Sequence, residues 1–258
     1  MQSIGLRKTI ELIWGKASLT LRSEASVNYL GYAWWVIEPL LHMVVYYVVF
    51  SLLLARGGDN YVAFLLTGLI PWLWFSKSIS HAQGSIIGGK ELMNQLYVPK
   101  LFFPLTKLTQ DAVKQSVVFA LLLAFLLVYG IDASVTWLWL VPIILLQLLF
   151  TTGCALLAAI LVPFVRDMAF VIPTGLQFMM FCSGIFFNPM DISPHLQFWF
   201  FLNPMAILLQ DYRDVLINNQ LPDLQQNLYV LVISLVLISV SAFLYKKLDH
   251  ALPRVVLQ

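Results

Sequence analysis

The composition of this 258-residue chain excludes a soluble protein. Hydrophobic residues make up 60% of it and charged residues only 11%, whereas soluble domains carry about 25% charged residues. So few charges cannot cover a water-exposed globule of this size, and the apolar surplus must therefore face lipid. The net charge of +2 gives no signal for nucleic acid, and the positions of the basic residues are more informative than their number.

The chain has six apolar stretches long enough for a spanning helix, which needs about 20 residues. Because these runs do not alternate between apolar and polar residues, they favour helices over the strands of a barrel. We expect an all-α integral membrane protein with an N-terminal segment (1–28), a membrane domain (30–247) and a cytoplasmic tail (248–258). The expected transmembrane helices cover about 32–55, 61–82, 102–130, 134–163, 168–189 and 224–246.

The segment 191–217 is also apolar, but Asn203-Pro204 interrupts it. It therefore predicts two short re-entrant helices at the periplasmic side and not a seventh span. A seventh span would carry Lys246 and Lys247 to the outside, against the excess of basic residues found in cytoplasmic segments. Six spans place both termini in the cytoplasm.

The N-terminal residues 3–28 mix apolar and basic side chains in a pattern typical of an amphipathic helix at the cytoplasmic membrane surface. The alternative is a solvated tail. The basic residues are Arg7, Lys8, Lys16 and Arg22.

The cytoplasmic loop 84–100 has a glycine break at Gly88-Gly89, a helix-competent stretch over Lys90–Tyr97 and a stop at Pro99. A short helix held between two spans suits docking of a soluble partner, although a polar connector is the alternative. The glycine spacing of a phosphate-binding loop is present, but Glu91 stands where the magnesium ligand is required. We find no nucleotide site, catalytic cluster or metal motif, so no cofactor is expected in this chain.

Charged residues inside the expected spans are costly and deserve an explanation. Lys107, Asp111 and Lys114 follow one another at helical spacing, so we expect them to neutralise one another along one helix. Glu38 lies near the cytoplasmic end of the first span, and the four histidines are scattered. These positions favour structural roles over proton transport.

Aromatic residues make up 14% of the chain. Most tryptophans lie near span ends, as in an interfacial belt. Other aromatic residues suit either packing against lipid or a path along which sugar rings slide. The candidates for lining such a path are Tyr46, Tyr47, Phe75, Phe178, Phe181, Phe186 and Phe187.

Five segments in a fixed order resemble one family. They are LRSEASVNYLGYAWWVIEPL, FLLTGLIPWLWFSKSIS, GGKELMNQLYVPKLFFPL, ILVPFVRDMAFVIPTGLQFMMFCSGIFFNPMDIS and LNPMAILLQDYRDVL. Over residues 19–247 the chain looks like the permease subunit of polysaccharide exporters of the ABC transporter superfamily. These type 2 export permeases serve O-antigen, capsule and teichoic acid pathways.

The resemblance implies a transport subunit of the inner (cytoplasmic) membrane that is not itself an enzyme. Two permeases would pair with two ABC ATPase subunits, which would bind the ATP and magnesium. The substrate would be a polysaccharide linked to undecaprenyl diphosphate, with O-antigen favoured. The alternatives are a capsule or teichoic acid permease, or a type 2 permease for a drug or lipid. A membrane glycosyltransferase would need an acidic catalytic pair, and a secondary transporter would need an internal repeat.

The resemblance also assigns roles to positions. Leu30-Gly31 would form the turn into the first span, beside a substrate entrance with the basic residues of segment 1–28. Residues Asp191–Val215 would form two periplasmic gate helices, with Asp191, Asn203, Pro204, Asp211 and Arg213 as gate residues. The coupling helix that docks on the ATPase would comprise Gly89, Lys90, Glu91, Leu92, Met93, Asn94, Gln95, Leu96 and Tyr97.

Overall fold

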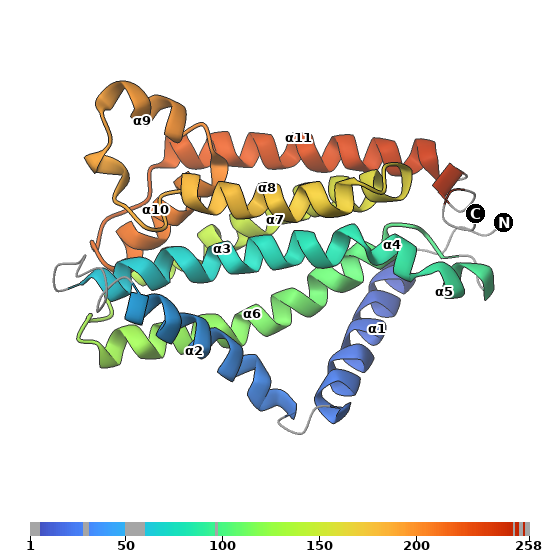
Figure 1. Cartoon of the computed structure of the whole chain (residues 1–258), viewed down its shortest axis with the longest axis horizontal. Coiled ribbons are helices and arrows are strands. Elements are labelled where there is room, and N and C mark those ends of the chain that lie inside the picture. Colours follow the sequence, from blue (N-terminus) through green and yellow to red (C-terminus); the bar gives the residue numbers. More distant parts are fainter. Residues whose placement is uncertain are drawn as a thin grey trace.

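The computed structural model describes residues 6–27, 31–49, 60–95, 98–249, 251, 252 and 255. Over these residues the chain forms helices and turns without a strand, which confirms the expected helical class. The helices (Figure 1) are α1 (Leu6–Val27), η1 (Gly31–Ala33), α2 (Trp34–Tyr47), α3 (Tyr61–Gln83), α4 (Ser85–Gly88), α5 (Lys90–Gln95), α6 (Phe102–Val128), η3 (Val135–Trp139), α7 (Leu140–Phe164), α8 (Met168–Cys182), η4 (Pro189–Asp191), α9 (Pro194–Phe200), α10 (Pro204–Leu216) and α11 (Leu224–Leu248).

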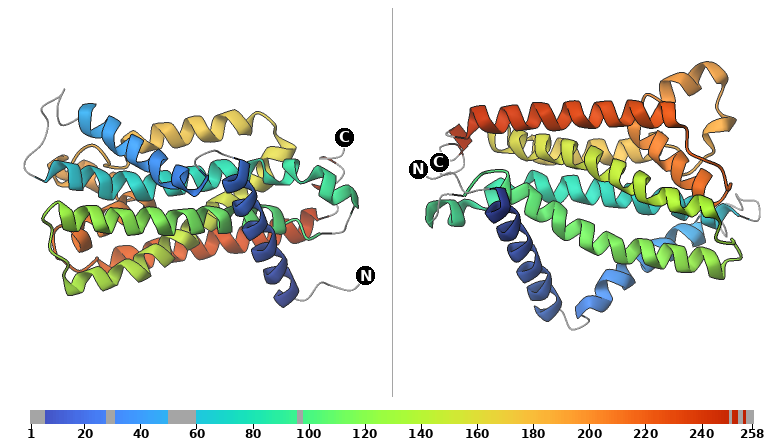
Figure 2. Two further views of the ribbon diagram at one scale, coloured as in Figure 1. Left: turned by 90° about the horizontal axis from the view of Figure 1, so that it is seen from below. Right: turned by 180° about the vertical axis from the view of Figure 1, so that it is seen from behind.

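Among the described residues, four helical segments are long and apolar enough to cross a membrane: Tyr61–Gln83, Phe102–Val128, Val135–Phe164 and Leu224–Leu248. Their bounds agree with four of the expected spans to within a few residues. They lie side by side along the long axis of the molecule (Figures 1 and 2). Apart from the helix ends and the internal Pro71 and Pro163, the backbone polar groups of such helices find their partners inside the helix, which is the condition for crossing lipid.

The fifth expected span is shorter as a helix than the sequence predicts. Of the first expected span, α2 covers 14 residues, and residues 50–55 lie outside the described part of the chain. Helix α8 has 15 residues and ends at Cys182, not near 189. Fifteen residues reach about 22 Å, less than the roughly 30 Å hydrocarbon core. The chain turns away after α8, where Gly184 has a φ of 74°.

Helix α3 is the centre of the bundle. In its most apolar stretch 72% of the residues are buried inside the chain, against 22% for α11. It contacts α6 on one side and α7 on another, and α10 also packs against it. Helix α11 packs mainly against α7, so its other face is left for lipid or for another chain.

The contact between α7 and α11 depends on small side chains. At Gly153 a Cβ atom would stand 2.7 Å from the Cβ of Leu237, so the two backbones approach too closely for any larger residue. Ser241 donates a hydrogen bond from its hydroxyl to the Gly153 carbonyl at 3.5 Å. Small residues at such crossings are typical of helix packing in membranes.

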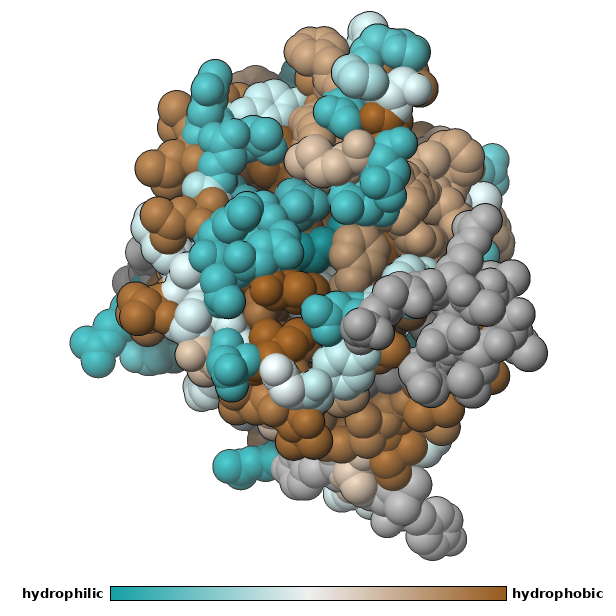
Figure 3. Space-filling model, turned by 90° about the vertical axis from the view of Figure 1, so that its left-hand side faces the viewer, coloured by the Kyte–Doolittle hydropathy of each residue, from teal (hydrophilic) through white to brown (hydrophobic). Residues whose placement is uncertain are grey.

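The two ends of the bundle differ. Helix α1 begins and α11 ends at one end, where α4 and α5 also lie, and α9 and α10 lie at the opposite end (Figure 1). Helix α1 runs across the bundle and not along it (Figure 2). Seen from the α9 and α10 end, hydrophilic side chains gather near the middle of the face and hydrophobic side chains flank them (Figure 3).

Candidate functional site

Helices α1 and α2 form an elbow beside the bundle, and Gly31 opens η1, which leads into α2 (Figure 2). Gly31 adopts a φ of 50°, and a Cβ atom there would stand 3.0 Å from the Ala25 carbonyl oxygen, so this position requires glycine. Of the expected turn Leu30-Gly31, Leu30 lies outside the described residues. The elbow brings the last turn of α1 close to the first turns of α2.

Helix α1 is amphipathic, as predicted. Ile13, Ala17 and Leu21 are buried and repeat every four residues, so they form one face, which packs on α6. The predicted basic residues lie on the exposed part of the helix. The exposed ones are Arg7, which pairs with Glu11 at 3.1 Å, and Lys8, Lys16 and Arg22.

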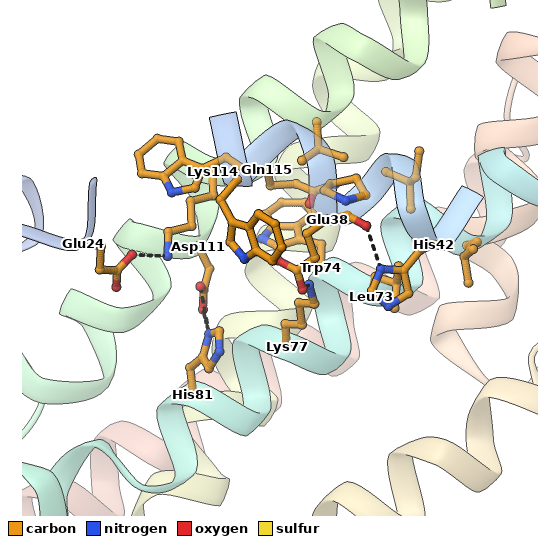
Figure 4. A pocket seen from close by; sticks show the side chains of 16 residues that line it. Glu24, Glu38, His42, Leu73, Trp74, Lys77, His81, Asp111, Lys114 and Gln115 are labelled. Atoms are coloured by element: carbon orange, nitrogen blue, oxygen red, sulfur yellow. Dashed lines mark hydrogen bonds and ion pairs between the residues drawn. The ribbon is translucent and has the colours of Figure 1, made fainter. Parts of the chain in front are cut away.

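A cavity of about 320 Å³ lies between this elbow, α3 and α6. Such a volume is at the small end of the range for ligand pockets, about 300–1,000 Å³. Its wall carries the indole rings of Trp34, Trp35 and Trp74, together with charged groups from all four helices. Figure 4 shows these side chains converging on one space.

Ion pairs between helices hold the charged groups of the cavity. Glu38 of α2 accepts a hydrogen bond from Lys77 of α3 at 2.5 Å, and Glu24 of α1 accepts one from Lys114 of α6 at 2.5 Å. The ring Nδ1 of His81 on α3 lies 2.9 Å from an Asp111 carboxylate oxygen on α6. The Lys114 ammonium also stands 5.7 Å from the centre of the Trp35 ring.

This arrangement corrects the expectation for Lys107, Asp111 and Lys114. In the described residues Asp111 and Lys114 form their ion pairs with α3 and α1, not with one another along α6. The reason lies in the tertiary structure. Helix α3 brings His81 within about 3 Å of Asp111, and helix α1 brings Glu24 within the same distance of Lys114. Ion pairs between flexible side chains one turn apart on an exposed helix are weaker than such fixed contacts.

Within the predicted coupling helix, residues 89–97, the structure has one short helix, α5, and the single turn α4 precedes it; both lie at the end of the bundle away from α9 and α10 (Figure 1). Lys90, Glu91, Asn94 and Gln95 are exposed, whereas Leu92 and Met93 pack against the apolar cluster around Phe103. Leu96 and Tyr97 lie outside the described residues. The segment therefore has a polar outer face and an anchored inner face.

Gly89 fixes the position of α5. A Cβ atom at this residue would stand 2.2 Å from the ring of the buried Phe103, so the loop lies directly on α6. At the neighbouring Gly88 nothing lies within 4 Å of the same atom. Only one of these two adjacent glycines is thus required by packing.

At the opposite end lie α9 and α10, two short helices within the residues 191–217 for which two short helices were expected (Figure 1). Asn203 begins α10: its side-chain oxygen accepts a hydrogen bond from the Met205 amide at 3.0 Å, and Pro204 follows. The same side chain donates to the Ser183 hydroxyl at 2.9 Å, which ties α10 to the end of α8. Helix α9 is largely exposed, whereas α10 is buried in the bundle. Asp191 is exposed in η4.

Helix α10 carries polar groups into the core. The Tyr212 hydroxyl donates to the Gln147 side-chain oxygen at 2.7 Å, and Gln147 donates to the Pro71 carbonyl at 2.8 Å, so α10, α7 and α3 share one buried chain of hydrogen bonds. Arg213, only 2% exposed, donates to the carbonyls of Ile185 and Phe64 at 3.2 and 3.4 Å. Its guanidinium lies 3.6 Å from the centre of the Phe64 ring, a favourable cation–π geometry.

Two ionisable groups of α10 are shifted because they are buried. Burial, reinforced by Asp214, raises the pKa of Asp211 to about 8. Burial lowers the pKa of Arg213 to about 9, so the guanidinium stays charged at neutral pH. The two residues are two positions apart and point to different sides of the helix, so they do not pair. One carboxylate oxygen of Asp211 has no hydrogen-bond partner among the described residues.

Within the described residues no three His, Cys, Asp or Glu side chains gather into a metal site. Three candidate sites stand out in the described part of the chain: the cavity beside the elbow, the α4 and α5 segment, and the α9 and α10 pair.

Comparison with known proteins identifies the family. The model of the ABC-2 type transporter family matches residues 13–217. The chain belongs to this family. It is 32% identical over 205 residues to the O-antigen export system permease protein RfbA of Klebsiella pneumoniae, covering 79% of this chain and 78% of that protein. It is 28% identical to RfbA of Myxococcus xanthus over 88% of both chains, and 25% identical to the polysialic acid transport protein KpsM of Escherichia coli over 86% and 88%.

In this ABC-2 family member the family match covers the elbow, the cavity, the α4 and α5 segment and both helices α9 and α10. Helix α11 lies beyond the matched residues, although it completes the set of long apolar helices.

The aromatic residues predicted to line a path fall into different environments. Phe178 and Phe181 are exposed on α8, at 68% and 55%, and Phe187 is exposed after it. Phe186 is partly buried and stacks on Phe181. Phe75 is buried in the core and stacked on Phe150, so its position does not support a lining role in this chain. The side chains of Tyr46 and Tyr47 lie outside the described part of the structure.

Sequence reasoning missed the cavity. It did not single out Lys77, although a lysine within the expected span 61–82 is a charge inside the membrane and therefore a signal. Glu24 and Trp34 carried no such signal, because their roles depend on the elbow that brings α1 back against α6.

The pKa of Asp211 leads to a prediction about pH. Because this pKa is raised in the folded state, the unfolded chain binds fewer protons between about pH 4 and pH 8, and stability falls as the pH rises through that window. Asp211→Asn should remove this dependence and raise the midpoint of thermal unfolding at pH 8 more than at pH 5. Size-exclusion chromatography of heated, detergent-purified protein would measure it. Asp132→Asn, a control at an exposed position, should keep the pH dependence of the wild-type protein. If Asp211→Asn and Asp132→Asn show the same pH dependence of thermal unfolding, the prediction is wrong.

Proposed function

We propose that this chain is the membrane subunit of an ATP-driven ABC exporter that moves a lipid-linked polysaccharide, O-antigen first among the candidates, across the cytoplasmic membrane. The observation that carries the proposal is the 32% identity to an O-antigen export permease over most of both chains. The four candidate spans and the family match support a transport role. A capsule polysaccharide is the second candidate, supported by the 25% identity to KpsM.

In the proposed topology the chain has six spans, and α4 and α5 face the cytoplasm with both termini. This orientation is supported by basic residues at the α5 end of the bundle: Lys90 begins α5, Arg166 lies between α7 and α8, and Lys246 and Lys247 lie in the last turn of α11. Two copies of the chain would pair with two ABC ATPase subunits that bind ATP and magnesium. Helices α9 and α10 would then close the periplasmic mouth.

In the proposed mechanism three parts of the protein act on the substrate or the ATPase: the basic face of α1, the space between the two protomers, and α5. The diphosphate of the carrier lipid would approach the basic face of α1. The glycan would pass between the two protomers, along exposed aromatic residues such as Phe178 and Phe181. The ATPase would push the exposed face of α5, and the packing of Gly89 on Phe103 would pass the movement to α6.

Removal of this subunit tests the function as a whole. In a strain that lacks the gene, the glycan should disappear from the cell surface and its lipid-linked form should accumulate inside, because no other step carries it across. Immunoblots of surface polysaccharide, compared with extracted lipid-linked glycan, measure both amounts. Normal surface glycan in the deletion strain would refute the proposal.

Docking through α5 depends on the position of Gly89. Gly89→Ala forces the Phe103 ring to move, at a cost of about 1–3 kcal/mol for overpacking, and should weaken copurification of the ATPase subunit and its stimulated ATP hydrolysis by roughly fivefold or more. Gly88→Ala is the matched control, since a Cβ atom there has nothing within 4 Å. If the Gly89→Ala and Gly88→Ala variants copurify equal amounts of the ATPase subunit, α5 is not the docking helix.

Charge reversal tests the basic face of α1. Arg7→Glu with Lys8→Glu should slow export in the complemented deletion strain, because it places negative charge where the diphosphate is expected to approach. Both side chains are exposed, so the fold should persist. The rate of appearance of surface glycan measures the effect, and an unchanged rate would exclude these residues from the entrance.

A further inference from the structure

The cavity beside the elbow presents both donors and acceptors. Three of its polar side chains are only partly covered: Lys77, Glu38 and His81 are 40%, 43% and 50% exposed. An ion pair open on one side can accept hydrogen bonds at the carboxylate and donate them at the ammonium. The wall between these pairs is aromatic.

The charge of the cavity argues against a phosphate group. Three carboxylates (Glu24, Glu38 and Asp111) face two ammonium groups (Lys77 and Lys114), so with neutral histidines the formal charge is −1. A diphosphate would meet net repulsion here. The diphosphate is therefore expected at the basic face of α1 and not in this cavity.

One buried donor in the wall has no acceptor. Gln115 is 8% exposed and lines the cavity, and its side-chain nitrogen has no hydrogen-bond partner among the described residues. A buried donor left unpaired costs about 1–3 kcal/mol. This nitrogen has almost no accessible surface, so a ligand oxygen would reach it only after the Gln115 side chain turns toward the cavity.

We infer that this cavity binds one sugar ring of the exported glycan, an inference that rests on the proposed function and names a site within one protomer. A sugar ring has an apolar face of C–H groups and a rim of hydroxyls, each of which both donates and accepts. The indole of Trp34, 44% exposed, offers the flat apolar surface. The two lysine–carboxylate ion pairs and the His81–Asp111 hydrogen bond offer the polar contacts that fix orientation.

The position of the cavity suits an early step of transport. Its residues come from the elbow and from the parts of α3 and α6 nearer the α5 end, including Lys77, His81 and Asp111. A sugar ring bound there would lie between α2 and the bundle. Helix α2 is attached to α3 by the Glu38–Lys77 pair. A sugar ring that contacts both residues would add further contacts between α2 and α3 and would thereby stabilise the position of the elbow.

Photocrosslinking in cells tests the inference directly. A benzoyl-phenylalanine at His42, which lines the cavity, is compared with one at Phe243, which is 64% exposed on α11 away from it. The probe is the lipid-linked glycan that the cells themselves make. We expect irradiation to give a ladder of glycan adducts at position 42, spaced by the repeating unit, and no ladder at position 243.

Two results would overturn the inference. A single adduct of phospholipid mass at position 42 would show that lipid fills the cavity. The absence of any glycan ladder at position 42, while export proceeds, would show that the glycan does not enter it.

Substitution of Trp34 gives a second readout. Trp34→Ala should lower the export rate by roughly twofold to tenfold, the range expected for loss of one aromatic contact, and Trp34→Phe should restore most of it. Phe243→Ala removes an exposed ring elsewhere and should leave the rate unchanged. An unchanged rate with Trp34→Ala would overturn the stacking role.

The failure of this inference is distinguishable from failure of the proposed function. If deletion of the gene leaves surface glycan intact, the function itself is refuted. If deletion abolishes surface glycan but position 42 captures only lipid, the function stands and the cavity alone is excluded.

Discussion

The structure depends on how polar groups are partnered inside an apolar bundle. Helix α10 carries Asp211, Tyr212 and Arg213 in succession into the core, where an unpaired polar group is costly. Tyr212 and Arg213 find partners on α7, α3 and the chain after α8. A charged arginine buried without a contacting carboxylate is held by carbonyls and an aromatic face, so α10 has one well-defined place in the bundle.

The contacts of Tyr212 and Arg213 make α10 different from α9, the other short helix of residues 191–217. Helix α10 is tied to the central helix α3, while α9 remains exposed and makes few contacts. If the pair closes the periplasmic mouth, α9 is the part free to move, because movement of α10 would break the Tyr212 and Arg213 contacts. Asn203 lies between them and holds the end of α8 as well.

A second set of polar partners holds the elbow. Here the ion pairs join four helices around a cavity and are not sealed in the core. Partly exposed ion pairs add little to stability. Their value lies in the preformed set of donors and acceptors that they offer to a sugar. They also connect α2, which makes few other contacts, to the bundle beside the cavity.

The sequence alone determined the class and the order of the parts. Scarcity of charge required lipid, and apolar residues interleaved with Arg7, Lys8, Lys16 and Arg22 indicated an amphipathic N-terminal helix. The glycine break before Lys90 and the stop at Pro99 marked the α5 segment, and Asn203-Pro204 marked the start of α10, because such local signals act through neighbours in the chain. Tertiary structure alone decided which charges meet. Asp111 and Lys114 are neighbours on one helix, yet they pair with His81 and Glu24, since only the folded elbow brings those residues near. The burial of Phe75 and the early end of α8 have the same cause: contacts between helices, and turns between them, depend on segments far apart in the sequence.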